Sequence, residues 1–100
     1  MIRSLVEDLD GDIVECADGT EAISACVVHH PEWVLMDVSM RPMDGLTATR
    51  KIKRFLPETK IVIVTDHTDA KTRQAAIDAG ANGFCGKQDL MPLRRLIGEH

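Results

Sequence analysis

Apolar positions along the chain alternate between two kinds of pattern. Short, largely apolar runs at residues 13–16, 33–38, 60–65 and 83–86 favour strands, and the run at 33–38 suits a parallel strand covered on both faces. Between and around them lie segments whose apolar residues recur at helical spacing. Strands and helices that alternate in this way predict an α/β fold, with a parallel sheet that carries helices on both faces.

Capping signals set the expected helix boundaries. Helical spacing opens the chain at residues 1–9, and the next helix is expected to start after Asp18, which with Glu21 forms a capping box, and to stop before Pro31. Further helices are expected at 46–56, closed by Pro57, at 69–79, ended by Gly80, and from Asp89 to Ile97.

The helix at 46–56 is expected to follow a loop at 40–45, because Pro42 and Gly45 are loop-forming residues. Its apolar positions predict an inward face formed by Ile52, Phe55 and Leu56. Its basic positions are expected to lie mostly in solvent: Arg50, Lys51, Lys53 and Arg54.

Composition narrows the class of protein. The chain has 100 residues with 44% apolar, enough for one globular domain, and its net charge of −4 disfavours nucleic-acid binding by this segment. No apolar run approaches the length of a membrane span, and no signal peptide opens the chain, so no membrane association is expected. The three cysteines, Cys16, Cys26 and Cys85, have no paired spacing for zinc and predict reduced thiols in a cytoplasmic protein.

Three polar residues lie at the ends of three successive predicted strands. Asp37, Thr65 and Lys87 stand at the carboxyl ends, where open parallel sheets bind their ligands. A carboxylate can attack a phosphoryl group, while a hydroxyl and an ammonium can hold its oxygens. Each residue alone also has an ordinary interpretation, as a turn residue, a helix cap or a solvated charge. Their conjunction favours one phosphoryl-binding pocket.

The motifs around these residues resemble the receiver domain of two-component response regulators. The segments that carry the likeness are LMDVSM at 35–40 followed by MDG at 43–45, IVIVT at 61–65, AGANGFCGK at 79–87 and ADGTEA at 17–22. The likeness covers essentially residues 1–100. It implies a flavodoxin-like, doubly wound parallel sheet and a signalling domain that catalyses only its own phosphorylation and dephosphorylation.

The resemblance also implies residue roles. Asp37 would accept phosphate from a histidine kinase or a phosphotransfer protein, and Lys87 would pair with that phosphate. Thr65 would hydrogen-bond the phosphoryl oxygen and shift toward it, and Phe84 would turn inward on activation. Asp37 and the backbone carbonyl of Ser39 would be ligands of Mg²⁺.

The sequence departs from the family at its start. Receiver domains open with a strand that ends in an acidic pair, and neither precedes Met1. The sheet is therefore expected to lack its first, central strand, and Mg²⁺ binding is expected to be weakened or lost. Three arrangements would accommodate this: a domain truncated at the N-terminus (and perhaps at the C-terminus), direct pairing of the strands at 13–16 and 33–38, or a second chain that fills the gap in a homodimer.

Two other functional classes remain as alternatives. The missing acidic pair motivates a receiver-like protein-binding module that works without phosphorylation. A phosphatase-like hydrolase with an aspartate nucleophile is disfavoured, because such enzymes place a second Asp two residues on, where this chain has Ser39.

Overall fold

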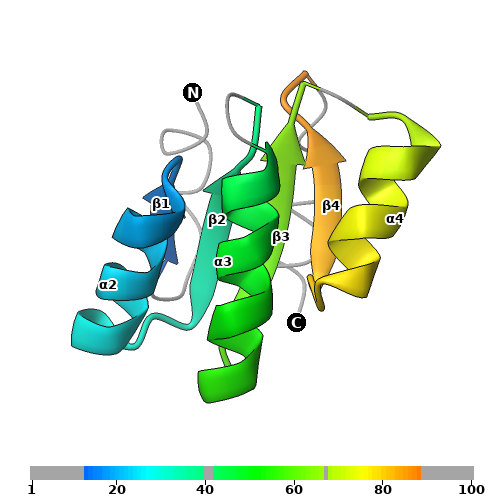
Figure 1. Ribbon diagram of the computed structural model, residues 1–100. Helices are drawn as coiled ribbons and strands as arrows, with labels where there is room; N and C mark the ends of the chain where they lie inside the picture. Colours follow the sequence, from blue (N-terminus) through cyan, green and yellow to red (C-terminus); the bar gives the residue numbers. More distant parts are fainter. Residues whose placement is uncertain (1–12, 40–41, 67, 89–100) are drawn as a thin grey trace.

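The computed structural model describes residues 13–39, 42–66 and 68–88. Within them, four parallel strands form one sheet in the order β1-β2-β3-β4 (Figure 1). The strands are β1 (Ile13–Cys16), β2 (Trp33–Asp37), β3 (Lys60–Thr65) and β4 (Gly83–Gly86). All four occupy the segments that the apolar runs predict, and β2 ends one residue earlier than expected.

The strands β1 and β2 pair directly, with Ile13 opposite Trp33 and Cys16 opposite Met36. Of the three arrangements considered for the start of the sheet, the described residues adopt direct pairing. The next two pairs are also parallel, so the carboxyl ends of β2, β3 and β4 meet along one edge of the sheet. We call this the carboxyl edge.

Three helices connect the strands: α2 (Gly19–His29), α3 (Pro42–Phe55) and α4 (Ala70–Asp78). Asp18 caps α2, and its Oδ1 accepts hydrogen bonds from the N–H groups of Thr20 at 2.7 Å and Glu21 at 3.2 Å. Asp69 caps α4 through the N–H of Thr72. Gly80, with φ of 97°, follows α4 in the left-handed conformation that glycine adopts without strain. Asp18 and Gly80 therefore lie where the sequence predicts them, whereas Asp69, expected as the first residue of the helix, is its N-cap.

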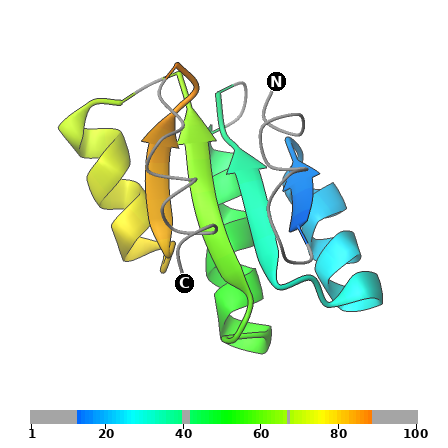
Figure 2. The same ribbon diagram turned by 180° about the vertical axis from the view of Figure 1, so that it is seen from behind.

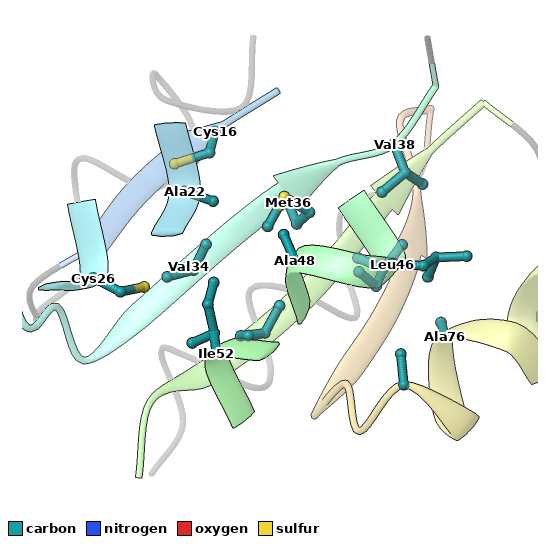
Figure 3. Close-up of a cluster of buried hydrophobic side chains, with 13 residues drawn as sticks. Cys16, Ala22, Cys26, Val34, Met36, Val38, Leu46, Ala48, Ile52 and Ala76 are labelled. Carbon is teal, nitrogen blue, oxygen red and sulfur yellow. The ribbon is translucent and has the colours of Figure 1, made fainter. Parts of the chain in front are cut away.

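Helices α2, α3 and α4 lie on one face of the sheet, in front in Figure 1 and behind in Figure 2. Side chains from the helices and the sheet form the main core there, with Val34, Met36 and Ile52 near its centre (Figure 3). On the opposite face a second buried cluster contains Trp33, Leu35, Val62, Val64 and Cys85. A sheet that is apolar and buried on both faces is the expected pattern for parallel strands.

Two expectations for α3 are wrong. The helix begins at Pro42 rather than Leu46, because proline fits the first turn of a helix, where its missing N–H costs nothing. Phe55 points outward and is 72% exposed. The buried residues of α3 recur at helical spacing and leave Phe55 outside their face; they are Gly45, Leu46, Ala48, Thr49 and Ile52.

Lys53 is a third departure from the expected solvent-facing pattern. Its ammonium donates to the carbonyl oxygens of Pro57 at 3.1 Å and Thr59 at 2.8 Å, and to the Asn82 side-chain oxygen at 3.0 Å. That same Asn82 oxygen accepts from the Ile61 N–H at 2.9 Å. Lys53 therefore ties together the two turns that lead into β3 and β4.

The three cysteines are free and buried. Burial raises the pKa of Cys16 to about 11 and also raises the pKa of Cys26, so both thiols are protonated core groups. Among the described residues, no helix combines the length and apolar character that crossing a membrane requires. The helices expected at 1–9 and from 89 to 97 lie outside the described residues.

Candidate functional site

The carboxyl edge brings the predicted site residues together. Asp37 is the last residue of β2, Thr65 is the last residue of β3, and Lys87 directly follows β4. Two backbone hydrogen bonds fasten this edge: the Val38 N–H donates to the Val64 carbonyl at 2.9 Å, and the Lys87 N–H donates to the Thr65 carbonyl at 3.0 Å. Successive β-strands thus present an acid, a hydroxyl and an amine on one side of the molecule.

Asp37 is held through both carboxylate oxygens. Its Oδ1 accepts a hydrogen bond from the Ser39 N–H at 3.0 Å, and its Oδ2 forms an ion pair with the Lys87 ammonium at 2.8 Å. The Asp37 side chain is 21% exposed and that of Lys87 is 33% exposed. The carboxylate is therefore fixed in orientation and still reachable from solvent.

The charges of this pair are stabilised by each other. Partial burial raises the pKa of Asp37, but hydrogen bonds from Lys87 and Ser39 and the charge of Lys87 outweigh it and hold the pKa below its usual value. The hydrogen bond to Asp37 raises the pKa of Lys87. Asp37 is therefore an anion and Lys87 a cation throughout the physiological range, as a nucleophile and a phosphate-binding group require.

A pocket of about 480 Å³ opens beside Thr65 and Lys87. Thr65 is buried at the end of β3 and stands opposite Gly86 of β4. Thr68 approaches Gly86 closely: a Cβ at Gly86 would lie 2.8 Å from the Thr68 methyl carbon, so a side chain there would displace Thr68. The predicted switch residue Phe84 lines the same pocket.

Sequence reasoning named Ser39 only for its backbone carbonyl. In the structure its hydroxyl oxygen also accepts a hydrogen bond from the Asp66 N–H at 2.9 Å. Ser39 thereby joins the loop after β2 to the loop after β3, while its own N–H orients Asp37. The sequence does show a polar residue, Ser39, two positions after Asp37. It gives no sign that Ser39 contacts Asp66, because the two residues lie on different loops.

The described residues offer few oxygen ligands for Mg²⁺ at this site. Mg²⁺ in proteins commonly takes one or two carboxylates and completes its octahedron with phosphate and water oxygens. Asp37 supplies one carboxylate and the Ser39 carbonyl supplies a second oxygen of the right chemistry. Over residues 13–39, 42–66 and 68–88, no group of three histidine, cysteine, aspartate or glutamate side chains gathers to form a metal site. The donor set therefore fits an ion that shares its ligands with a phosphoryl group.

Comparison with known proteins identifies the family. The family model described as the response regulator receiver domain matches residues 1–97. The chain belongs to the response regulator receiver family. It is 39% identical over 88 residues to the response regulator UvrY of Escherichia coli K12, covering 86% of this chain and 40% of that protein. The oxygen regulatory protein NreC of Staphylococcus haemolyticus is also 39% identical, over 85 residues, covering 84% of this chain and 39% of NreC.

Solved structures support the same fold. A LuxR-family two-component response regulator from Aurantimonas sp. SI85-9A1 superposes with a TM-score of 0.78 at 30% identity, covering 95% of this chain and 69% of that one. The signal receiver domain of the putative response regulator NarL from Mycobacterium tuberculosis gives 0.72 at 19% identity, covering 81% and 86%. The receiver domain here therefore has the α/β, flavodoxin-like fold expected from the sequence.

The chain spans about 40% of the length of the curated relatives it matches. It is a signalling domain of two-component systems, and phosphorylation-dependent switching is the general function of its family. Receiver domains in general bind Mg²⁺ and interact with histidine kinases or phosphotransfer proteins.

Proposed function

We propose that this receiver domain accepts a phosphoryl group on Asp37 from a phosphohistidine of a kinase or phosphotransfer protein. The observation that carries the proposal is the contact between Asp37 Oδ2 and the Lys87 ammonium at 2.8 Å, at the edge where the strands end. A carboxylate fixed by one backbone N–H and one ammonium is a preorganised nucleophile beside a group that binds phosphate.

The transfer requires one bond to form and one to break. An Asp37 oxygen attacks phosphorus as the bond from phosphorus to the donor imidazole nitrogen breaks, and the imidazole leaves with the electron pair of that bond. After transfer, the ammonium of Lys87 pairs with the phosphoryl group, because this group carries more negative charge than the Asp37 carboxylate did. Thr65, buried beside the pocket, supplies a hydroxyl to the same group.

A Mg²⁺ ion would be held by Asp37 and the Ser39 carbonyl. When bound, it would neutralise charge on the phosphoryl oxygens. The Ser39 N–H keeps one Asp37 oxygen oriented toward its loop, and the Ser39 hydroxyl keeps that loop against Asp66. The protein's own contribution is therefore to hold the two oxygen ligands close together, one at the end of β2 and one just after it.

Labelling with a small-molecule phosphodonor tests the acceptor. Incubation with acetyl phosphate and Mg²⁺ is expected to phosphorylate the wild-type chain, and Asp37→Asn is expected to abolish the label. Asp66→Asn is the matched control, since Asp66 is an exposed carboxylate next to Thr65 at the same edge. Label that survives in Asp37→Asn and disappears in Asp66→Asn would reassign the acceptor.

A binding module that works without phosphorylation is the second candidate. It is favoured by the small donor set for Mg²⁺ in the described part of the chain. The two candidates differ in their response to Mg²⁺, which can be followed through the amide resonances of Ser39 and Asp66. Millimolar Mg²⁺ that shifts both resonances supports the phosphoacceptor, whereas resonances that stay fixed up to high millimolar Mg²⁺ support the second candidate.

A further inference from the structure

Arg73 and Phe84 form a contact that the proposed phosphoryl chemistry does not use. The Arg73 guanidinium carbon lies 4.9 Å from the centre of the Phe84 ring, within the range of a cation–π interaction. Arg73 is an exposed residue of α4, and Phe84 is a half-buried residue of β4. The contact therefore joins a surface helix to the strand that leads to Lys87.

The pair stands between two hollows. Arg73 and Phe84 line the pocket of about 480 Å³ beside Thr65 and Lys87. Both also line a smaller pocket of about 190 Å³ on the side of Ala81 and Asn82. A rotation of the Phe84 ring would exchange space between the two hollows, and Arg73 sits over the ring at their boundary.

Gly86 and Thr68 line the larger hollow together with Phe84. Phe84 is opposite Ile63 in the register, and Gly86 is opposite Thr65, so Phe84 and Gly86 share one face of β4. A Cβ at Gly86 would lie 2.8 Å from the Thr68 methyl carbon, so Thr68 packs closely against this glycine in the wall of the hollow.

Among the described residues, small side chains make most of the contacts of α4 with the core: Ala75, Ala76 and, just after the helix, Ala79. Ala76 is its only buried residue between Ala70 and Asp78, and an alanine contributes little apolar area to hold the helix on the sheet. The contact with Phe84 adds a larger side chain to the attachment of α4, which stands at the outer edge of the sheet in Figure 1.

We propose that Arg73 is a positioning residue for the switch: its contact holds Phe84 out of the hollow beside Thr65, and phosphorylation must break this contact to bring the ring in. This inference rests on the proposed function of Asp37 and adds the residue that sets the resting position of the ring. Loss of the Arg73 cation shifts the resting ring toward the hollow.

Fluorine NMR of chains that contain 4-fluorophenylalanine gives a direct view of the ring. The chain has two phenylalanines, so two signals are expected, and the 72% exposed Phe55 serves as an internal reference. The variant Phe55→Leu assigns them. The resting state is recorded first, and Mg²⁺ with beryllium fluoride, a phosphoryl analogue, is then added to define the position of the active signal.

Arg73→Gln is the test variant, and Lys71→Gln is its control, because Lys71 is another exposed cation of α4. In Arg73→Gln the resting Phe84 signal is expected to move toward the active position. The analogue midpoint is expected to fall by about two- to fivefold, the ratio that one exposed cation–π contact supports. Arg73→Lys is expected to restore both values, since Lys60 lies over Trp33 at 5.2 Å in this same molecule.

The outcomes separate this inference from the proposed function. A Phe84 signal and a midpoint in Arg73→Gln that match those of Lys71→Gln overturn the role of Arg73. Failure of Asp37 labelling overturns the proposed function instead. A wild-type chain that is labelled on Asp37 but whose Phe84 signal ignores the analogue overturns this inference alone.

Discussion

Two lysines connect strand ends at opposite edges of the sheet. Comparison of their partners distinguishes a lysine of the proposed site, Lys87, from a structural lysine, Lys53. Lys87, at the carboxyl edge, meets the Asp37 carboxylate at 2.8 Å. Lys53, at the edge where the strands begin, meets the oxygens of Pro57, Thr59 and Asn82 at 2.8 to 3.1 Å. An ammonium has three donors, so Lys53 has all of its hydrogen-bonding capacity in use.

The two environments shift the lysine pKa in opposite directions. The hydrogen bond to Asp37 raises the pKa of Lys87, whereas burial against neutral oxygens lowers the pKa of Lys53. A lysine paired with a single reachable carboxylate can follow a new negative charge. A lysine satisfied by three fixed oxygens can only hold the turns where they are. The distances alone do not distinguish these roles, but the charge and exposure of the partners do.

The largest expected effect is on phosphorylation. Lys87→Met is expected to slow labelling by acetyl phosphate by about 100-fold or more, the usual cost of removing one preorganised charge-stabilising donor. Its stability is expected to change by about 1 kcal/mol or less, because the ion pair is partly exposed. Initial labelling rates and urea unfolding measure the two quantities. Lys53→Met, labelled under conditions where it is folded, is expected to keep the wild-type labelling rate. A labelling rate as low as that of Lys87→Met would contradict the distinction between the two lysines.

The second effect is on stability. Lys53→Met is expected to lower the free energy of unfolding by about 1.5–3 kcal/mol, since it removes charged hydrogen bonds to three oxygens. Urea denaturation followed by circular dichroism measures this. Lys51→Met is the matched control, because Lys51 is an exposed lysine on the same helix. Equal midpoints for the two variants would show that the Lys53 contacts contribute nothing to stability.

The Lys53 cluster can be tested further with a double-mutant cycle. Asn82→Ala removes the oxygen that Lys53 and the Ile61 N–H share. Because both variants break one connected set of hydrogen bonds, their combined destabilisation is expected to fall short of the sum by about 0.5 kcal/mol or more. Strictly additive unfolding energies would indicate two independent contacts.

The smallest effect is a pair of opposite slopes in alkaline solution. The pKa of Lys87 is raised above 10.5 in the folded chain, so its stabilising contribution is complete below 10.5 and is lost as pH rises through the folded pKa. The pKa of Lys53 is lowered, so the burial penalty on its charged form is relieved as pH rises through the folded value toward 10.5.

Urea unfolding between about pH 8.5 and 11 should reveal this difference. The difference in unfolding free energy between wild type and Lys87→Met is expected to narrow with rising pH. The difference between wild type and Lys53→Met is expected to widen, because the burial penalty on the Lys53 charge is relieved. Slopes of the same sign would contradict the assignment of distinct electrostatic roles.

The sequence predicted the strands and caps well because their signals are local. The run of residues 61–64 is β-branched throughout, Asp18 caps the helix that follows it, and Gly80 follows the end of α4. The start of α3 was missed because Pro42 and Gly45 have two possible roles. A Cβ at Gly45 would lie 2.4 Å from a Val38 methyl carbon, so this glycine serves close packing of helix on strand and not a turn.

The candidate site was predictable in its members but not in its contacts. Asp37, Thr65 and Lys87 follow from the rule that ligands bind where parallel strands end. The link between Ser39 and Asp66 and the position of Arg73 over Phe84 join residues far apart in sequence, and no spacing rule reaches them. Lys53 was misplaced for the same reason, because its partner Asn82 lies 29 residues away.

Chemical mapping of the phosphorylated residue tests the central claim most directly. Borohydride reduces an aspartyl phosphate to homoserine, and tandem mass spectrometry of tryptic peptides then locates the change. Lys60 lies between Asp37 and Asp66, so the two candidate carboxylates fall on different peptides. The account predicts one reduced residue, at position 37, in the acetyl phosphate-treated chain and none in Lys87→Met treated for the same short time. Reduction at Asp66 or at any other carboxylate in place of Asp37 would contradict it.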